Sequence, residues 1–200
     1  MVTDHYKALI YVIEQANKKT PISVELIKNI GALVLKNTGS VYETILGTVD
    51  ASKGEFRKGN VMAGSTYFPN YDKVGRLMND LVSTIQNKMN TNLSIEEQVN
   101  LSFDAHFNMV SIHPFYDGNG RSSRLLMNYI QKYYNLPLAI VNSESKVDYI
   151  EALIETREKE DISIFRDFMK QEYSNQLREE IKNFEKISKP NKGLGFKFLF

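Results

Sequence analysis

The sequence predicts an all-α fold with a small β-hairpin, and three observations support that class. Most of the chain consists of segments whose apolar residues recur every three or four positions, which is the spacing of amphipathic helices. Residues 46–71 break this pattern, with glycines and a proline among short β-prone pieces. The composition, 42% hydrophobic and 24% charged, is that of an ordinary globular domain. We therefore expect about seven or eight helices and one hairpin, in a single domain over residues 1–200.

Two helices are expected before the glycine-containing stretch. Residues 3–19 carry apolar side chains at helical spacing ahead of a proline, namely Tyr6, Leu9, Ile10 and Ile13. Ser23 is a candidate N-cap of the second helix, and Gly39 is a candidate for the left-handed residue just past its end. Residues 46–71 then read as loops with a small hairpin.

Three further helices are expected in the middle of the chain. Residues 72–90 place apolar side chains on one helical face, namely Val74, Leu77, Leu81 and Ile85. Ser94 and Glu97 form an S-x-x-E capping box, which predicts a helix from there to about Ile112. Residues 121–135 are apolar on nearly all sides, which is typical of a central, buried helix.

The C-terminal part is expected to hold two helices, over residues 146–160 and 161–187, and a tail that leaves the helical body at Pro190. The tail carries several apolar residues that would pack locally or dock a partner, namely Phe196, Phe198, Leu199 and Phe200. There is no internal repeat and no convincing domain boundary. Helix 3–19 and tail 189–200 are expected to be peripheral.

Charge and composition argue against several classes of protein. With 25 basic and 24 acidic side chains the net charge is +1, so no broad basic surface for nucleic acid is expected. The absence of cysteine excludes disulfides and thiolate metal sites. The N-terminus is interrupted by charged residues, and no apolar run approaches the roughly 20 residues that span a bilayer. We expect a cytoplasmic protein with no membrane partner.

The stretch "HPFYDGNGRSSR", residues 113–124, lies between two expected helices. Gly118, Asn119 and Gly120 stand where the second helix begins, so unpaired N–H groups and the positive end of its dipole meet there. Glycine lets a phosphate approach such a backbone closely. Arg121 and Arg124 are spaced i, i+3 and can reach the same anion. This junction therefore predicts a phosphate site.

Asp117 and His113 add reactive chemistry to that site. A single carboxylate beside phosphates is how Mg²⁺ is usually held, and a histidine that titrates near neutral pH can act as a general base. Taken singly, these residues are more typical of a turn, a helix cap and a solvated surface. Together in twelve positions they favour phosphoryl or nucleotidyl transfer to a hydroxyl group.

The same twelve residues match the signature of the Fic family, H-P-F-x-[D/E]-G-N-G-R-x-x-R, at every specified position. "GEFRKGNVMAGSTYFPNYDKV", "KVDYIEAL" and "DISIFRDFM" resemble further Fic segments, so the resemblance covers about residues 26–172. Fic proteins are all-α domains, and most transfer AMP from ATP to a hydroxyl side chain of a target protein, with release of pyrophosphate. The resemblance implies ATP as substrate, Mg²⁺ as cofactor and a protein as partner.

The resemblance also implies a role for each motif residue. His113 would deprotonate the Ser, Thr or Tyr hydroxyl of the target, and Asp117 would hold Mg²⁺ against the α- and β-phosphates. The amides of residues 118–120, with the Asn119 side chain, would cradle the phosphates. Arg121 would bind the β-phosphate region and Arg124 the γ-phosphate.

Besides the reactive groups, the resemblance implies an apolar anchor for the loop, a flap that binds the target and a residue beside the adenine ring. Phe115 would seat the loop, and the hairpin near Val61–Tyr67 would pair with the target backbone. Tyr149 is a candidate neighbour of adenine, although a plain core tyrosine is an equally good interpretation. Gly120 stands where a phosphate-transferring branch of the family has lysine, which favours nucleotidyl transfer. The choice of ATP over other nucleotides is not written in the motif.

Many Fic proteins carry an inhibitory helix with the motif [S/T]-x-x-x-E-[G/N], whose glutamate pairs with the second motif arginine. Here the S/T-x-x-x-E pattern occurs only at Thr156–Glu160, where Asp161 follows and a helix end is expected. Three arrangements stay open. We favour a separate, antitoxin-like inhibitory protein; the others are a glutamate of the stretch Glu179, Glu180 and Glu185, and an unrestrained enzyme.

Other sites fit the residues less well. "GEFRKG" has P-loop glycine spacing, but Asn60 and Val61 follow in place of lysine and serine or threonine. A Rossmann turn at "GNGRSS" lacks the preceding strand. His106 and His113 could suggest a metal pair, but a buried, hydrogen-bonded His106 is the better interpretation. The alternative functions are transfer of another nucleotide or of phosphate, and a non-catalytic module that binds nucleotide or peptide.

Overall fold

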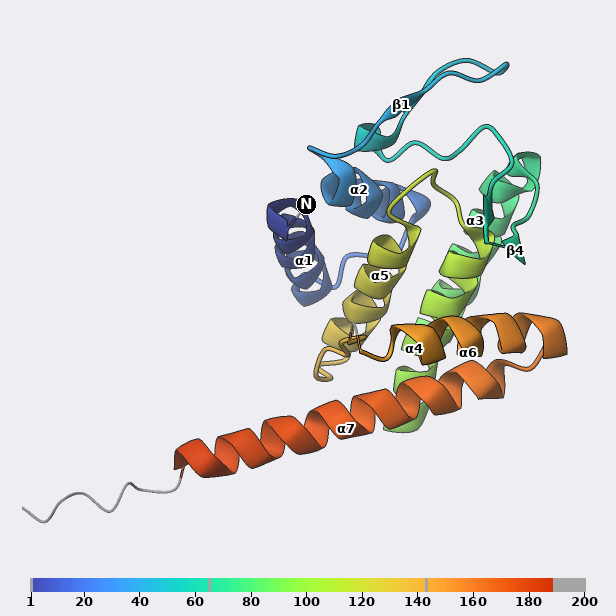
Figure 1. Cartoon of the computed structure of the whole chain (residues 1–200). Helices are drawn as coiled ribbons and strands as arrows, with labels where there is room; N and C mark the ends of the chain where they lie inside the picture. Colours follow the sequence, from blue (N-terminus) through green and yellow to red (C-terminus); the bar gives the residue numbers. More distant parts are fainter. Residues whose placement is uncertain (1, 65, 143, 189–200) are drawn as a thin grey trace, which may run out of the picture.

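The computed structural model describes residues 2–64, 66–142 and 144–188, and within them the fold is helical with two short hairpins (Figure 1). The helices are α1 Val2–Asn17, α2 Val24–Leu35, α3 Tyr71–Met89, α4 Ile95–Ile112, α5 Asn119–Tyr133, α6 Lys146–Lys159 and α7 Ile162–Ser188. The antiparallel strand pairs are β1 Val41–Tyr42 with β2 Val49–Asp50, and β3 Met62–Ala63 with β4 Thr66–Tyr67, and a 3-10 turn η1 spans Ala51–Lys53. The expected fold class is confirmed, with one hairpin more than the sequence predicted.

Helices α4 and α5 form the centre of the molecule. Helix α5 packs against α1, α2 and α4, while α4 also packs against α3 and α7 (Figure 1). Buried residues of α4 and α5 contribute to both apolar clusters of the fold, one shared with α1, α2 and α3 and the other with α6 and α7. Helix α5 is buried on nearly all sides, as predicted. The connection between these two helices is therefore held by the best-packed part of the protein.

The helix starts expected from the sequence are confirmed. The Ser23 side chain accepts a hydrogen bond from the N–H of Leu26, and Ser94 and Glu97 form the complete capping box at the start of α4. The prediction for Gly39 is wrong, because α2 already ends at Leu35 and Gly39 closes the following turn with ordinary φ. Glycine is required there for space, since a Cβ at this position would lie 2.6 Å from the backbone nitrogen of Ser52.

Helix α1 buries its small side chains and leaves the large ones partly exposed. Tyr6 and Ile10 are 62% and 39% exposed. The buried stripe consists of residues four apart, namely Asp4, Ala8, Val12 and Ala16. Short side chains allow α1 to lie close to α5. The larger residues at helical spacing thus predicted the helix but not the face that it buries.

Helix α7 packs against α4 and α6 along its first half, while residues 178–187 are exposed. It runs along one end of the molecule, and its second half extends past the other helices (Figure 1). Among the described residues no helix is both long enough and apolar enough to cross a membrane. The predicted tail after Pro190 lies outside the described residues.

Candidate active site between α4 and α5

The connection between α4 and α5 begins at His113, which has left-handed backbone angles, φ 54° and ψ 59°. Its N–H donates to the Met109 carbonyl and closes the last turn of α4, and Pro114 prevents the helix from continuing. Phe115 then turns inward and is fully buried. A methyl group on Gly31 of α2 would lie 2.7 Å from the Phe115 ring, so the absence of a side chain there makes room for it. Phe115 packs as the predicted apolar anchor.

Asn119 braces the loop. Its Oδ1 accepts from the N–H of Phe115 at 2.9 Å, and its Nδ2 donates to the Phe115 carbonyl at 2.8 Å. Because each end of this buried amide is engaged with the Phe115 backbone, the Asn119 side chain is fixed as a brace of the loop, and its backbone N–H is free to meet a ligand. Gly118 caps α5 at φ 77°, and a Cβ there would lie 3.3 Å from Val34 and Leu35. Conformation and space both call for glycine at this position.

The first turn of α5 presents its N–H groups to a cavity. The first intrahelical hydrogen bond runs from the N–H of Ser122 to the Gly118 carbonyl at 2.8 Å, so the N–H groups of residues 119–121 have no partner within the helix. The cavity has a volume of about 280 Å³, and its lining includes every predicted motif residue: His113, Asp117, Gly118, Asn119, Gly120, Arg121 and Arg124. An anion in this cavity would meet the positive end of the α5 dipole.

The two motif arginines differ in their contacts. Arg121 forms an ion pair with Asp117 at 3.2 Å, and its Nη1 is buried without a hydrogen-bond partner among the described residues. Arg124 has no carboxylate within ion-pair distance in the described part of the chain. Each therefore retains donors that a phosphate oxygen could accept from.

Asp117 is the one motif residue suited to a divalent cation. Its side chain is 59% exposed; Oδ1 accepts from the N–H of Gly118 and Oδ2 faces Arg121. No group of three or more acidic or histidine side chains that could hold a metal occurs among the described residues. The residues fit Mg²⁺ in the one-carboxylate form, in which phosphate oxygens and water complete the coordination.

The surroundings of His113 keep its imidazole neutral. Its Nδ1 lies 3.3 Å from the Val110 carbonyl. A carbonyl only accepts, so Nδ1 carries the proton and Nε2 has the free lone pair. Burial lowers the pKa of His113 from 6.5 to about 4, with Arg57 and Arg157 acting in the same direction and the Val110 carbonyl and Asp117 opposing. At neutral pH His113 is therefore in the unprotonated form that a general base requires.

Arg57 is a site residue that the sequence interpretation missed. It is 2% exposed, and its guanidinium donates to the carbonyls of His113 at 2.7 Å, Gly59 at 2.8 Å and Pro69. Its own N–H donates to the Pro114 carbonyl at 2.9 Å. Arg57 thus joins both ends of the flap segment to the base. "GEFRKG" resembled a family segment, but hydrogen bonds to residues 56 positions away have no signal in local sequence.

The β3–β4 hairpin lies where the flap was predicted, and Phe68 follows it directly. The Phe68 ring stacks on the His113 imidazole, with centroids 3.8 Å apart and an interplanar angle of 19°. Between this segment, α4, α5 and α6 is a second cavity, of about 470 Å³, which reaches the first through His113, Gly120 and Arg124. The flap therefore covers both the base and a space beside the phosphate site.

Tyr149 combines the two interpretations that the sequence left open. It is 7% exposed and belongs to the second apolar cluster, yet it also lines the 470 Å³ cavity. Its hydroxyl lies 2.7 Å from Nε2 of the fully buried His106. Burial lowers the pKa of His106 to about 3, so this histidine is neutral. The expectation of a buried, hydrogen-bonded His106 is confirmed.

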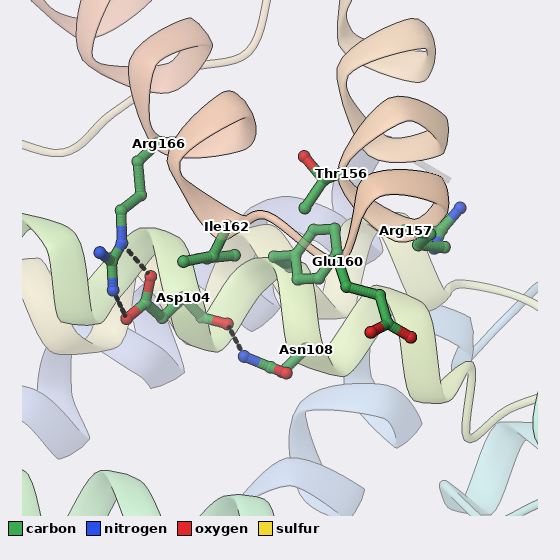
Figure 2. A pocket seen from close by; sticks show the side chains of 8 residues that line it. Asp104, Asn108, Thr156, Arg157, Glu160, Ile162 and Arg166 are labelled. Atoms are coloured by element: carbon green, nitrogen blue, oxygen red, sulfur yellow. Dashed lines mark hydrogen bonds and ion pairs between the residues drawn. The ribbon is translucent and has the colours of Figure 1, made fainter.

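The glutamates considered for autoinhibition lie elsewhere. Glu160 caps the C-terminus of α6 with φ 52°, so Thr156–Glu160 is a helix end as expected. Both line a separate cavity of about 410 Å³ between α4, α6 and α7, where Asp104 pairs with Arg166 at 2.7 Å (Figure 2). Glu179, Glu180 and Glu185 are exposed on the second half of α7. In the described residues none of these carboxylates forms an ion pair with Arg124.

Comparison with known proteins identifies the family. The profile of the Fic/DOC family matches residues 21–131. The chain is 32% identical over 133 residues to protein adenylyltransferase Fic of Aedes aegypti, covering 66% of this chain and 26% of that protein. The corresponding Drosophila melanogaster protein is 32% identical over 129 residues, 64% of this chain and 25% of that protein. This chain thus matches only about a quarter of the length of these relatives.

Solved structures show the same fold. A Fic domain containing signaling protein from Bacteroides thetaiotaomicron has a TM-score of 0.70 at 20% identity, covering 86% of this chain and 68% of that one. Fic-1 from C. elegans has a TM-score of 0.70 at 19% identity, covering 92% and 52%. BepC from Bartonella tribocorum, solved with bound AMPPNP, has a TM-score of 0.55 at 14% identity, covering 84% and 86%. By its family profile and its fold, the chain belongs to the Fic/DOC family.

Proposed function

We propose that this chain is a protein adenylyltransferase that transfers AMP from ATP to a Ser, Thr or Tyr hydroxyl of a target protein and releases pyrophosphate. The observation that carries the proposal is a neutral His113, with its Nε2 lone pair free, in one cavity with the unpaired N–H groups of α5 and with Arg124. The curated relatives named above are protein adenylyltransferases, which supports the same activity.

In the proposed reaction the hydroxyl proton of the target passes to Nε2 of His113. The hydroxyl oxygen forms a bond to the α-phosphorus, and the bond from that phosphorus to the oxygen bridging to the β-phosphate breaks. Pyrophosphate leaves with the negative charge, which the α5 N–H groups, Arg121 and Arg124 stabilise. Mg²⁺, when bound beside Asp117 and the phosphates, supplies positive charge that offsets the charge of the leaving group.

The target would dock on the flap. Met62 and Tyr67, which pair across the β3–β4 hairpin, are 55% and 79% exposed. An extended segment of the target can add to such an edge through backbone hydrogen bonds, which would fix its hydroxyl near His113. Because Arg124 has no ion-pair partner in the described residues, a carboxylate of a separate inhibitory protein could take the place of the γ-phosphate there.

Incubation with Mg²⁺ and ATP labelled at either the α- or the γ-phosphate, together with a cell lysate, tests the proposal. Label from the α-phosphate is expected on a protein, and label from the γ-phosphate is not. His113→Ala is expected to abolish this transfer while still binding AMPPNP. Transfer of the γ-label would instead indicate a phosphotransferase, and nucleotide binding without transfer of either label would indicate a binding module.

A further inference from the structure

The 470 Å³ cavity has a phosphate end and an apolar end. Gly120, Arg124 and His113 line the side that it shares with the smaller phosphate cavity. The other side is formed by Val110 of α4 and by neighbouring positions on one face of α6, namely Ile150, Leu153 and Ile154. A flat aromatic ring attached to the phosphates would find apolar surface at that end. On the proposed function, this is where the nucleobase lies.

Few polar groups face this apolar end. Among the residues that line it are Thr66 of the flap, Tyr149 and Arg157. The Tyr149 hydroxyl is already engaged with His106 at 2.7 Å. Among the side chains that line this end, Arg157 therefore offers the free charged group that a nucleobase could use, and that group consists only of donors.

The Arg157 guanidinium is held in place but not paired. Its Nε donates to the Ser111 hydroxyl at 3.0 Å, and its central carbon lies 5.7 Å from the centroid of the Phe68 ring and 5.9 Å from that of Phe107. In the described residues no carboxylate lies within ion-pair distance of it, and its Nη1 and Nη2 form no hydrogen bond. A half-buried guanidinium fixed at Nε and between two rings offers its two remaining nitrogens as a planar pair of donors.

The neighbouring cavity does not use these donors. Arg157 also borders the 410 Å³ cavity of Figure 2, where Asp104 is bound to Arg166. Glu160, three residues further along, forms no ion pair with Arg157 in the part of the chain described. Among the described residues Nη1 and Nη2 of Arg157 thus have no partner on this side either, and they remain available to a ligand of the nucleotide cavity, which Arg157 also lines.

We propose that Arg157 selects the nucleobase, and that it makes this site accept GTP as well as ATP. Two parallel donors match the O6 and N7 acceptors of guanine, whereas the same edge of adenine offers one acceptor and one donor. An arginine in this position therefore favours guanine over adenine. A glutamine there would instead match adenine, because its side chain has one donor and one acceptor. The inference rests on the proposed function for the location of the base.

Binding of the non-hydrolysable analogues GMPPNP and AMPPNP to the full chain, with Mg²⁺ and measured by calorimetry, tests the assignment without requiring transfer. The wild-type protein is expected to bind both. Arg157→Gln is expected to lower the affinity for GMPPNP relative to AMPPNP by about tenfold or more, the scale of one bidentate contact to a base. Lys159→Gln is the control, because it removes an exposed positive charge of α6 that pairs with Glu155 and is not among the residues lining the cavity.

A wild-type protein that binds only AMPPNP would overturn the proposal. So would an Arg157→Gln variant, folded by circular dichroism, that binds both analogues as the wild type does or weakens both equally. A rise only in the KM for the protein target would assign Arg157 to an acidic residue of that target instead. If the preference between the two analogues shifts as expected but the wild-type protein transfers no label, the assignment of the nucleobase site stands and the proposed transferase activity fails.

Discussion

The loop between α4 and α5 and the β3–β4 flap face each other across one cavity, yet they are held in opposite ways. The loop is buried through Pro114 and Phe115 and is braced by both ends of the Asn119 side chain. The flap tip is exposed at Met62, Ala63 and Gly64 and is joined to the body mainly at its ends. On the proposed function, the groups that must be placed accurately for chemistry lie on the rigid side, and the surface that must adapt to a target lies on the other.

Arg57 is the point where the two regions meet, and its loss is expected to have the largest effect. Arg57→Met would leave the carbonyls of His113, Gly59 and Pro69 without this donor in a partly buried place. Each carbonyl left without a donor costs about 1–3 kcal/mol, and relaxation of the structure recovers a part of this cost. We therefore expect the free energy of unfolding to fall by about 3 kcal/mol or more. Thermal unfolding should show a Tm lower by about 6–12 °C.

The matched control for Arg57→Met is Met62→Ser at the flap tip. Met62 is 55% exposed, so this change should alter the free energy of unfolding by no more than about 0.5 kcal/mol. It should instead raise the KM for the protein target if the flap is the docking edge. Equal losses of stability from the two variants would show that the flap is as tightly built into the fold as the loop.

The loop and the flap each contain a glycine with left-handed backbone angles, Gly118 and Gly64, and adding a methyl group to each tests how tightly the two regions are packed. Both positions have a φ that is unfavourable for alanine. In Gly118→Ala the new Cβ would also lie 3.3 Å from Val34 and Leu35, whereas in Gly64→Ala it meets no atom within 4 Å. We expect Gly64→Ala to cost about 1 kcal/mol from backbone strain alone, and Gly118→Ala about 2–3 kcal/mol. Urea denaturation measures the loss in free energy of unfolding for each variant. Equal losses would contradict the packing argument.

Phe68, which directly follows the flap hairpin, stacks on the His113 imidazole. Phe68→Leu removes the ring that stacks on His113 at 3.8 Å, which should cost about 1 kcal/mol of stability. It should also let water reach the imidazole, so that burial depresses the pKa of His113 less. Titration of the His113 ring protons by NMR should show a pKa higher than in the wild type. An unchanged pKa would mean that the burial comes from α4 and the loop alone.

The smallest expected effect is that of mild acid on the proposed transfer by the wild-type protein. Because the pKa of His113 is lowered to about 4, the base stays neutral between pH 8 and pH 6, and the rate of transfer set by this base should change by less than about twofold. Stability behaves differently: the unfolded chain protonates this histidine near pH 6.5 and the folded chain only near pH 4, so stability is lost as the pH falls through that interval. His113→Ala should lose less stability over the same interval.

The sequence predicted those parts of the fold that depend on local chemistry. The capping box at Ser94, the end of α4 at Ile112 and the turn at Gly118 that starts α5 follow from residues near one another in the chain. The β1–β2 hairpin was missed, since two-residue strands carry too little alternation to be recognised. The buried face of α1 was missed because it is made of small residues that contribute little to a hydrophobic pattern.

In the site, the motif gave the reactive groups but not their environment. The direction in which the pKa of His113 shifts depends on burial and on Arg57 and Arg157, which are distant in sequence. The brace formed by Asn119 also could not be foreseen, because an asparagine beside a phosphate loop suggests a ligand contact as readily as a loop contact. Tertiary contacts decide such roles.

The left-handed backbone of His113 has an evolutionary consequence. A non-glycine residue at φ 54° costs about 1 kcal/mol or more, and this strain is borne by the residue assigned as the base. A library randomised at this codon and screened only for heat resistance should therefore enrich glycine or asparagine, and each such clone should be inert. On the proposed function, histidine at this position thus gives up some stability in exchange for transfer.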